Sequence, residues 1–153
     1  MQKLSRRLLE KMGFVNTECS IIQSKGAKFN ILSIERDKKL NPKKEPGVYM
    51  WVSKKQDIYT VRYIGKAGNG LRNRIKQHEA GYKRHGSIKL DKCLDDNHLL
   101  EIWFKISDYK KSNIYNIFKK TSLFSFEEEI LILEYAKTIF NKIPKYMTLP
   151  NKE

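Results

Sequence analysis

The sequence predicts an α+β domain in which a small central β-sheet, antiparallel or mixed, is flanked by helices. Two segments with strong β propensity follow each other closely at residues 48–52 and 58–64, and a third lies at 99–106. Segments with helical periodicity stand before, between and after these strands. The chain has 153 residues and a hydrophobic content of 40%, which suits one folded domain with a modest core.

The first 45 residues are expected to form an extension that packs on the same domain, while residues 46–153 make up the main unit. Residues 2–12 have the pattern of a short amphipathic helix, which a glycine ends. Its apolar side chains share one face: Leu4, Leu8, Leu9 and Met12. Residues 14–35 are ambiguous, although the stretch that begins at Phe29 has strand character.

A charged loop with two prolines, residues 36–46, separates the extension from the main unit. The β-rich segments 48–52 and 58–64 are joined by a short polar turn, so they are expected to pair as a hairpin around which the third strand is added. Three glycines within residues 65–70 predict a loop after the second strand.

Residues 71 to about 82 have the periodicity of a helix, and a basic loop then leads to the strand at 99–106. A short helix is expected to begin at Asp108. Ser125 is followed three residues later by Glu128, which fits a capping box and predicts a long apolar helix near the C-terminus.

The net charge narrows the class of partner. Lys and Arg total 31 against 17 acidic residues, a formal charge of +14, and such a field attracts polyanions such as nucleic acid. No apolar run approaches the roughly 20 residues of a membrane helix, and the basic N-terminus lacks the apolar stretch of a signal peptide. The isolated cysteines, Cys19 and Cys93, suggest reduced thiols. We therefore expect a cytoplasmic protein with no membrane partner.

Two short motifs lie on the predicted hairpin, and further features follow them. The motifs are Gly47-Val48-Tyr49 and Tyr63-Ile64-Gly65. After them come a glycine loop, a helix with Arg74 and His78 four residues apart, and an apolar helix that bears a glutamate and precedes Pro144-Lys145-Tyr146. Over roughly residues 45–147, this series resembles the GIY-YIG nuclease superfamily.

The chain departs from the pattern of that superfamily in four places. The interval between the hairpin motifs is long, the glycine loop is one residue longer than common, and a basic insert precedes the third strand. Tyr146 is followed by Met147, where many members have an asparagine. Asn141 and Asn151 are the candidates to replace that asparagine.

The resemblance implies roles for residues on the hairpin. Tyr49 would be the base that takes a proton from water, and Tyr63 would bind the phosphate or assist. Since a free tyrosine has a pKa near 10, Tyr49 would need neighbouring cations to lower its pKa. Lys66, Arg74 and a bound metal are the cations expected to do so.

On the helix, Arg74 is expected to present its planar guanidinium to the scissile phosphate. Arg72 is the competing residue, but it points about 160° away on a helix of 3.6 residues per turn. Only Arg74 shares a face with His78. His78 would either donate a hydrogen bond to phosphate or accept the water proton.

The cofactor expected from the resemblance is Mg²⁺, or Mn²⁺ in its place, and such ions prefer carboxylate oxygens. Glu134 interrupts an apolar helix, which dipole effects at a helix start do not explain, so it is the preferred ligand. Glu129 is the alternative, because its spacing to Asn141 resembles that in some restriction-type members.

The DNA-binding surface is expected to be broad and basic. Residues 64–90 hold many cations, among them Lys66 and Lys89, and the loop expected after the arginine helix contains Tyr82 and His85. The residues assigned to DNA binding are Arg72, Lys76, Lys83, Arg84, Arg6 and Arg7.

The expected function is thus a metal-dependent endonuclease that cleaves duplex DNA, with a restriction enzyme first and a phage or mobile-element nuclease second. A catalytically inactive DNA-binding module, a DNA-repair nuclease subunit and a basic structural protein are the alternatives. One site cuts one strand, so a double-strand cut needs two visits or a homodimer. The apolar face of the N-terminal helix would either form that dimer or pack on its own domain.

Overall fold

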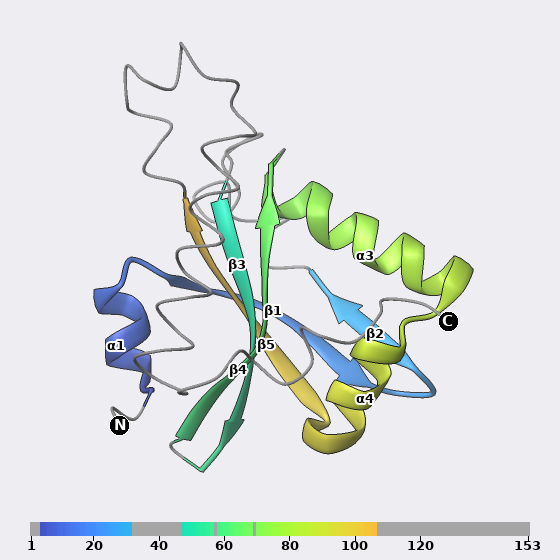
Figure 1. Cartoon of the computed structure of the whole chain (residues 1–153), viewed down its shortest axis with the longest axis horizontal. Helices are drawn as coiled ribbons and strands as arrows, with labels where there is room; N and C mark the ends of the chain where they lie inside the picture. The colour runs from blue at the N-terminus through green and yellow to red at the C-terminus, as the bar shows by residue number, and fades with distance from the viewer. Residues whose placement is uncertain (1–3, 32–46, 57, 69, 107–153) are drawn as a thin grey trace.

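The computed structural model describes residues 4–31, 47–56, 58–68 and 70–106. Five strands form one sheet in the order β2-β1-β5-β3-β4, and every neighbouring pair is antiparallel (Figure 1). The strands are β1 (Val15–Gln23), β2 (Ala27–Asn30), β3 (Gly47–Lys55), β4 (Ile58–Ala67) and β5 (Leu99–Ile106). The helices are α1 (Arg6–Lys11), α3 (Leu71–His85) and α4 (Ile88–Asn97). The α+β class predicted from the sequence is confirmed.

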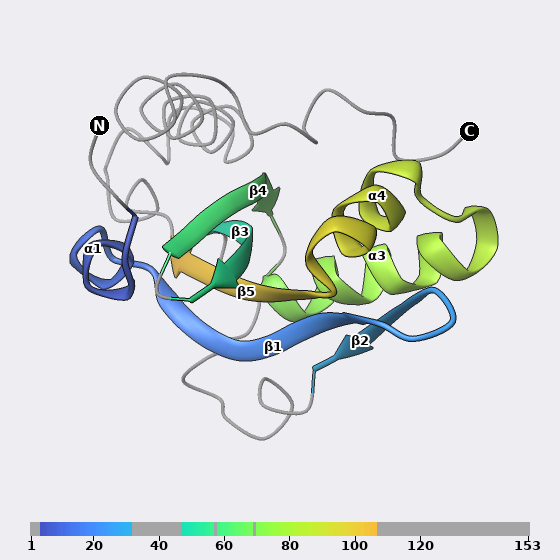
Figure 2. The same cartoon turned by 90° about the horizontal axis from the view of Figure 1, so that it is seen from below.

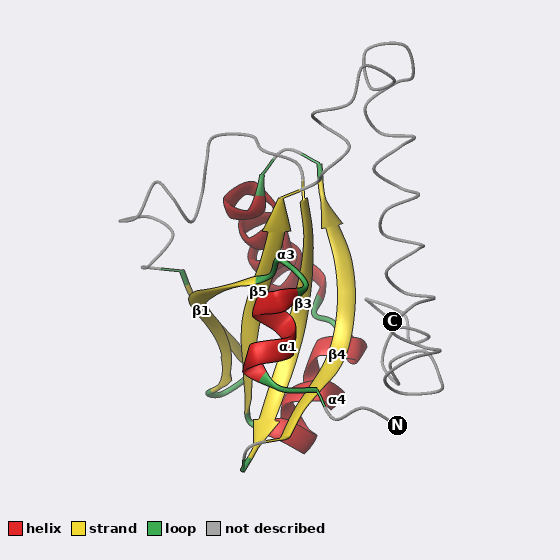
Figure 3. Cartoon of the chain, turned by 90° about the vertical axis from the view of Figure 1, so that its left-hand side faces the viewer, coloured by secondary structure: helices red, strands yellow, loops and turns green. Residues whose placement is uncertain are grey.

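The two faces of the sheet carry different helices. Alternate side chains of a strand point to opposite faces, so Tyr49 and Trp51 of β3 share one core with α3 and α4. Met50 and Val52 belong to a second core, to which α1 contributes. Figure 2 shows α1 at one end and the α3–α4 pair at the other, and Figure 3 shows α1 in front of the sheet with the pair behind it.

Helix α1 is fixed at both its cap and its apolar face. The Ser5 side chain accepts a hydrogen bond from the Leu8 amide, which caps the helix start. Leu4 and Leu9 are buried, and Leu8 and Met12 pack against the same core. The apolar face of α1 therefore packs on its own domain, which is one of the two outcomes expected for it.

The N-terminal segment supplies two strands to the sheet. β1 pairs with β2 on one side and with β5 on the other, while β5 also pairs with β3. The strand expected from Phe29 onward instead begins at Ala27 and ends at Asn30. Strand β5 has the predicted bounds. It lies in the interior of the sheet, because one of its edges pairs with β3 and the other pairs with β1.

The hairpin of β3 and β4 is longer than expected. Its strands extend to Lys55 and Ile58, so the long interval between the two motifs is regular strand pairing with one register shift after Trp51. The prediction of a loop over residues 65–70 is wrong at its start. Gly65, Lys66 and Ala67 continue β4, because they pair with the first residues of β3.

Two further expectations about the region after the hairpin are corrected. Helix α3 runs to His85, so Tyr82, Arg84 and His85 lie in its last turn and not in a loop. The basic loop expected before β5 is instead largely helix α4. The Ser87 side chain caps α4 by accepting from the Leu90 amide. The buried apolar side chains of the helix recur at helical spacing: Leu90, Cys93 and Leu94.

Both cysteines are buried thiols and form no disulfide with each other. Among the helices that the structure describes, none has the length and apolar character to cross a membrane. The short helix expected from Asp108 and the long helix expected from Ser125 lie outside the described residues.

Candidate active site

Close backbone contact explains the glycines of both hairpin motifs. Tyr49 of β3 is paired with Gly65 of β4, and its ring lies where a Cβ atom on Gly65 would have to be. A Cβ atom on Gly47 would overlap the Phe104 ring and the Lys105 carbonyl of β5. Glycine at position 65 thus leaves room for the tyrosine ring of the neighbouring strand.

The hydroxyl of Tyr49 joins strand β3 to helix α3. It lies 2.6 Å from Nε2 of His78 and 3.4 Å from Nε of Arg74. A guanidinium nitrogen can only donate, so the Tyr49 oxygen accepts from Arg74, while the direction of its hydrogen bond with His78 depends on the His78 tautomer. For Tyr49 to donate to His78, Nε2 must be unprotonated, which is the neutral tautomer with its proton on Nδ1.

The charges around this group favour neutral forms. Burial, together with the positive charges of Arg74 and Lys89, lowers the pKa of His78 to about 4. Burial also raises the pKa of Tyr49 well above 10, with a contribution from Tyr63, and Arg74 opposes the rise without overcoming it. The expected lowering of the Tyr49 pKa is therefore not provided by the described residues.

An aromatic cluster surrounds the Tyr49–His78 pair. The Tyr63 ring centroid lies 6.0 Å from that of Tyr49 and 4.4 Å from that of Trp51. The Trp51 ring meets the His78 ring edge-on at 5.4 Å. Trp51 was not among the residues predicted for the site. Strand alternation could have indicated it, since residues 49 and 51 must share a face.

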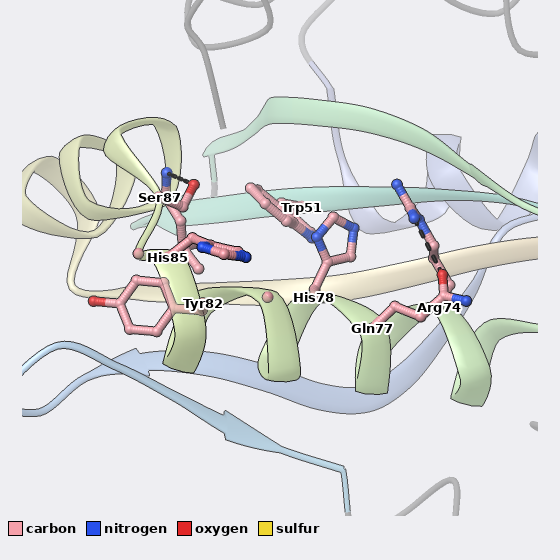
Figure 4. A pocket seen from close by; sticks show the side chains of 10 residues that line it. Trp51, Arg74, Gln77, His78, Tyr82, His85 and Ser87 are labelled. Carbon is pink, nitrogen blue, oxygen red and sulfur yellow. Dashed lines mark hydrogen bonds between the residues drawn. The ribbon is translucent and has the colours of Figure 1, made fainter. Parts of the chain in front are cut away.

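A pocket of about 240 Å³ opens beside this cluster (Figure 4). In Figure 4, Arg74 and His78 rise from successive turns of α3, with Trp51 above the helix. The Arg74 Nη1 atom also donates to Gln77 at 3.2 Å, which holds the guanidinium against the pocket wall. The lining residues come from β3, α3 and the start of α4: Trp51, Arg74, Gln77, His78, Gly81, Tyr82, His85, Gly86, Ser87 and Leu90.

The predicted DNA-binding residues fall in two places. A second hollow of about 520 Å³ runs along α3, and Lys76 and Arg84 line it together with His85. Two more of the predicted cations are exposed on this helix: Arg72 and Lys83. The remaining two, Arg6 and Arg7, lie on α1, whose core is on the other face of the sheet, and Arg6 pairs with Glu10. The structure therefore brings only the α3 cations near the Tyr49 cluster.

Lys66 is exposed on β4, directly after the strand position that faces Tyr49. Its backbone lies in a ladder, so its amide is not part of a phosphate-binding loop as expected. The charges that shift the Tyr49 pKa come from Tyr63 and Arg74.

The donor set of the cluster is phenol, imidazole and guanidinium, which is not the oxygen-rich set that Mg²⁺ prefers. Among residues 4–31, 47–56, 58–68 and 70–106, no three acidic, histidine or cysteine side chains group together as a metal site. These residues alone do not fit a divalent cation, so a carboxylate from elsewhere is required. The predicted ligands Glu134 and Glu129, and the asparagines Asn141 and Asn151, lie outside the described residues.

Comparison with known proteins bears on this arrangement. The GIY-YIG catalytic domain is the family whose model matches, over residues 45–140. No curated protein and no solved structure matches the chain at a significant level. The match covers more than half of the chain, including the hairpin with Tyr49 and Tyr63 and the helix with Arg74 and His78. The chain therefore belongs to the GIY-YIG family of nucleases.

Proposed function

We propose that this protein is a divalent-metal-dependent endonuclease that hydrolyses phosphodiester bonds of duplex DNA. The observation that carries the proposal is the hydrogen-bonded set of Tyr49, His78 and Arg74 at the wall of an open pocket. These three groups supply a proton path and a cation at one place, and phosphodiester hydrolysis needs both. An intact set of this kind argues against an inactive DNA-binding module.

The proton path begins at the attacking water. Tyr49 has a raised pKa and is not ionised beforehand, so it acts by relay: its oxygen takes the water proton as its own proton passes to His78 Nε2. His78 is neutral above a pH of about 4 and can receive that proton. The imidazolium that forms afterwards returns the proton to solvent or to the leaving oxygen.

Other side chains of the site bind the phosphate group and balance its charge. Arg74 donates to the Tyr49 oxygen through Nε, and its guanidinium, which lines the pocket, would bind the phosphate. The Tyr63 hydroxyl donates to a phosphate oxygen, and exposed Lys66 contacts the backbone of the strand. Lys76, Arg84, Lys83 and Arg72 extend this basic surface along α3.

Mg²⁺ is the ion we propose, with Mn²⁺ as its substitute. Glu134 would hold it, and Glu129 is the alternative ligand. A bound ion would supply Lewis-acid chemistry, polarising the phosphate and stabilising charge on the departing oxygen. Restriction is the biological role we place first, because α4 makes this compact domain an elaborated member, and a phage or mobile-element role comes second.

The test is incubation of pure protein with supercoiled plasmid in the presence of Mg²⁺, Mn²⁺ or chelator. Cleavage should require the ion, and Glu134→Gln should abolish cleavage while preserving DNA binding. Glu129→Gln is the matched control and should cost little. Retained DNA binding without cleavage under any divalent ion would show the inactive binding module instead, and the reverse order of the two variants would move the ligand to Glu129.

A further inference from the structure

Lys89 is a buried cation in the first turn of α4. Its residue is 5% exposed, and its Nζ atom lies 4.7 Å from the centroid of the Tyr63 ring. Within the part of the chain that the structure describes, this ammonium contacts that aromatic face, and no carboxylate forms a salt bridge with it. A ring face repays only part of the free-energy cost of removing an ammonium from water.

Two further features make this position unfavourable for a cation. Ser87 is the N-cap of α4, so Lys89 is the second residue of the helix and lies at its positive end. The ammonium also adds to the positive field at His78, where Arg74 already acts. Burial lowers the pKa of Lys89, because removal from water disfavours the charged ammonium. Among the described residues, the Tyr63 ring face is the favourable contact shown for this charge, so an anion bound there would stabilise it further.

The side chain that Lys89 touches identifies the anion. Tyr63 belongs to the second hairpin motif, and its ring lies between Lys89 and Trp51 beside the Tyr49–His78 pair. An anion beside the Tyr63 ring would meet the Lys89 ammonium, and a charged ammonium is one of the donors that bind phosphate in proteins.

We propose that Lys89 is a substrate-contacting residue of this site, whose ammonium binds a phosphate group of the DNA strand next to Tyr63. The inference rests on the proposed nuclease function, and it adds to it a cation from helix α4. In the sequence, Lys89 was only one of several cations in a basic stretch. The structure separates it from the other lysines of that stretch because it is buried at the cluster while they are exposed.

The variants follow from this geometry. Lys89→Met removes the charge and keeps a side chain of similar length, so it should fold and be at least as stable as the wild type. Lys89→Arg keeps the charge and should retain part of the function. Lys54→Met is the matched control, because Lys54 also lies over a tyrosine, 5.5 Å from the Tyr59 centroid, but is exposed at the far end of the hairpin.

Three measurements are made on each variant: plasmid cleavage with Mg²⁺, the salt dependence of duplex-DNA affinity in chelator, and the shift of Tm by inorganic phosphate against chloride at equal ionic strength. Lys89→Met should cleave about 100-fold more slowly. Its log–log salt slope should be shallower by about 0.9, as expected for one lost phosphate contact. Phosphate should raise the Tm of the wild type and of Lys54→Met, but not that of Lys89→Met.

The outcomes separate this inference from the proposed function. If the wild type does not cut DNA but phosphate protects it through Lys89, the anion site stands and the nuclease function fails. If the wild type cuts and Lys89→Met matches it in rate, slope and phosphate response, the inference is overturned. A large fall in the Tm of Lys89→Met, with equal losses in Lys89→Arg, would also overturn it by showing a structural role.

Discussion

Arg74 donates to the Tyr49 hydroxyl and lines the pocket, so one side chain both orients the relay and faces the phosphate. We expect Arg74→Ala to slow cleavage by about 10²- to 10³-fold, since one charge-stabilising donor is worth roughly 3–4 kcal/mol in a transition state. Initial rates of plasmid nicking measure the loss, and circular dichroism checks the fold. Arg72→Ala is the control, because Arg72 is exposed on the same helix. Equal rates for the two variants would remove Arg74 from the mechanism.

His78 makes stability depend on pH. Its pKa falls from 6.5 to about 4 on folding, so between these values the unfolded chain binds more protons than the folded one. The free energy of unfolding should therefore drop as the pH falls from about 6.5 to about 4, by on the order of 3 kcal/mol in total. Denaturant unfolding of wild type and His78→Gln at several pH values measures it.

The variant His78→Gln should show a flatter dependence on pH than the wild type. His85→Gln, in an exposed histidine of the same helix, should keep the wild-type slope. Parallel curves for the wild type and His78→Gln would show that His78 does not titrate as this environment requires.

The sequence predicted the partners at this site better than their protonation. The four-residue spacing of Arg74 and His78 placed both on one helix face, and the structure brings both to Tyr49. The direction of the Tyr49 pKa was missed because it depends on burial, which comes from packing of distant segments and not from the motif. Lys89 was missed as a buried group for the same reason.

At the level of strands, the fit of β4 against β3 depends on the missing side chain of Gly65. In Gly65→Ala the new methyl group overlaps atoms of the Tyr49 ring. We therefore expect a loss of about 1–3 kcal/mol in the free energy of unfolding. Cleavage should fall as well, because the ring must move away from His78. Gly68→Ala is the control, since a Cβ atom there would meet nothing within 4 Å. Thermal unfolding and plasmid assays compare the two, and equal stability would contradict the packing argument.

Helices and strands differed in how well their sequences revealed them. The pattern of β5 predicted its bounds, because its inward residues are large and apolar. β1 was not recognised, because one of its inward residues is the polar Thr17, which interrupts the apolar pattern of the strand. In the structure the Thr17 hydroxyl donates a hydrogen bond to the carbonyl of Ile102. α4 carried its signal in the cap at Ser87 and in the spacing of its buried residues, but its lysines and aspartates suggested a loop.

For the molecule as a whole, the packing of α1 bears on how many DNA strands are cut in one encounter, because this helix was the candidate surface for a dimer. Its apolar face is used within the chain, so we expect a monomer that cuts one strand per encounter. Nicked circles should accumulate before linear plasmid at limiting enzyme, and light scattering should give the mass of one chain. A dimer mass together with linear product and no nicked intermediate would contradict this expectation.

The order of the strands has a consequence for how the chain folds. β3 and β4 are joined by a tight turn and can pair early, but Thr17 of β1 reaches its partner Ile102 only across 85 positions of sequence. Closing that long loop costs chain entropy before the strand pairing that stabilises it can form. Refolding should therefore take milliseconds to seconds, and stopped-flow fluorescence of Trp51 and Trp103 would measure it. During synthesis, β1 leaves the ribosome long before β5 exists. For that interval the edge of β1 that will pair with β5, on a strand with Cys19 and Ile21, must be kept from associating with other chains.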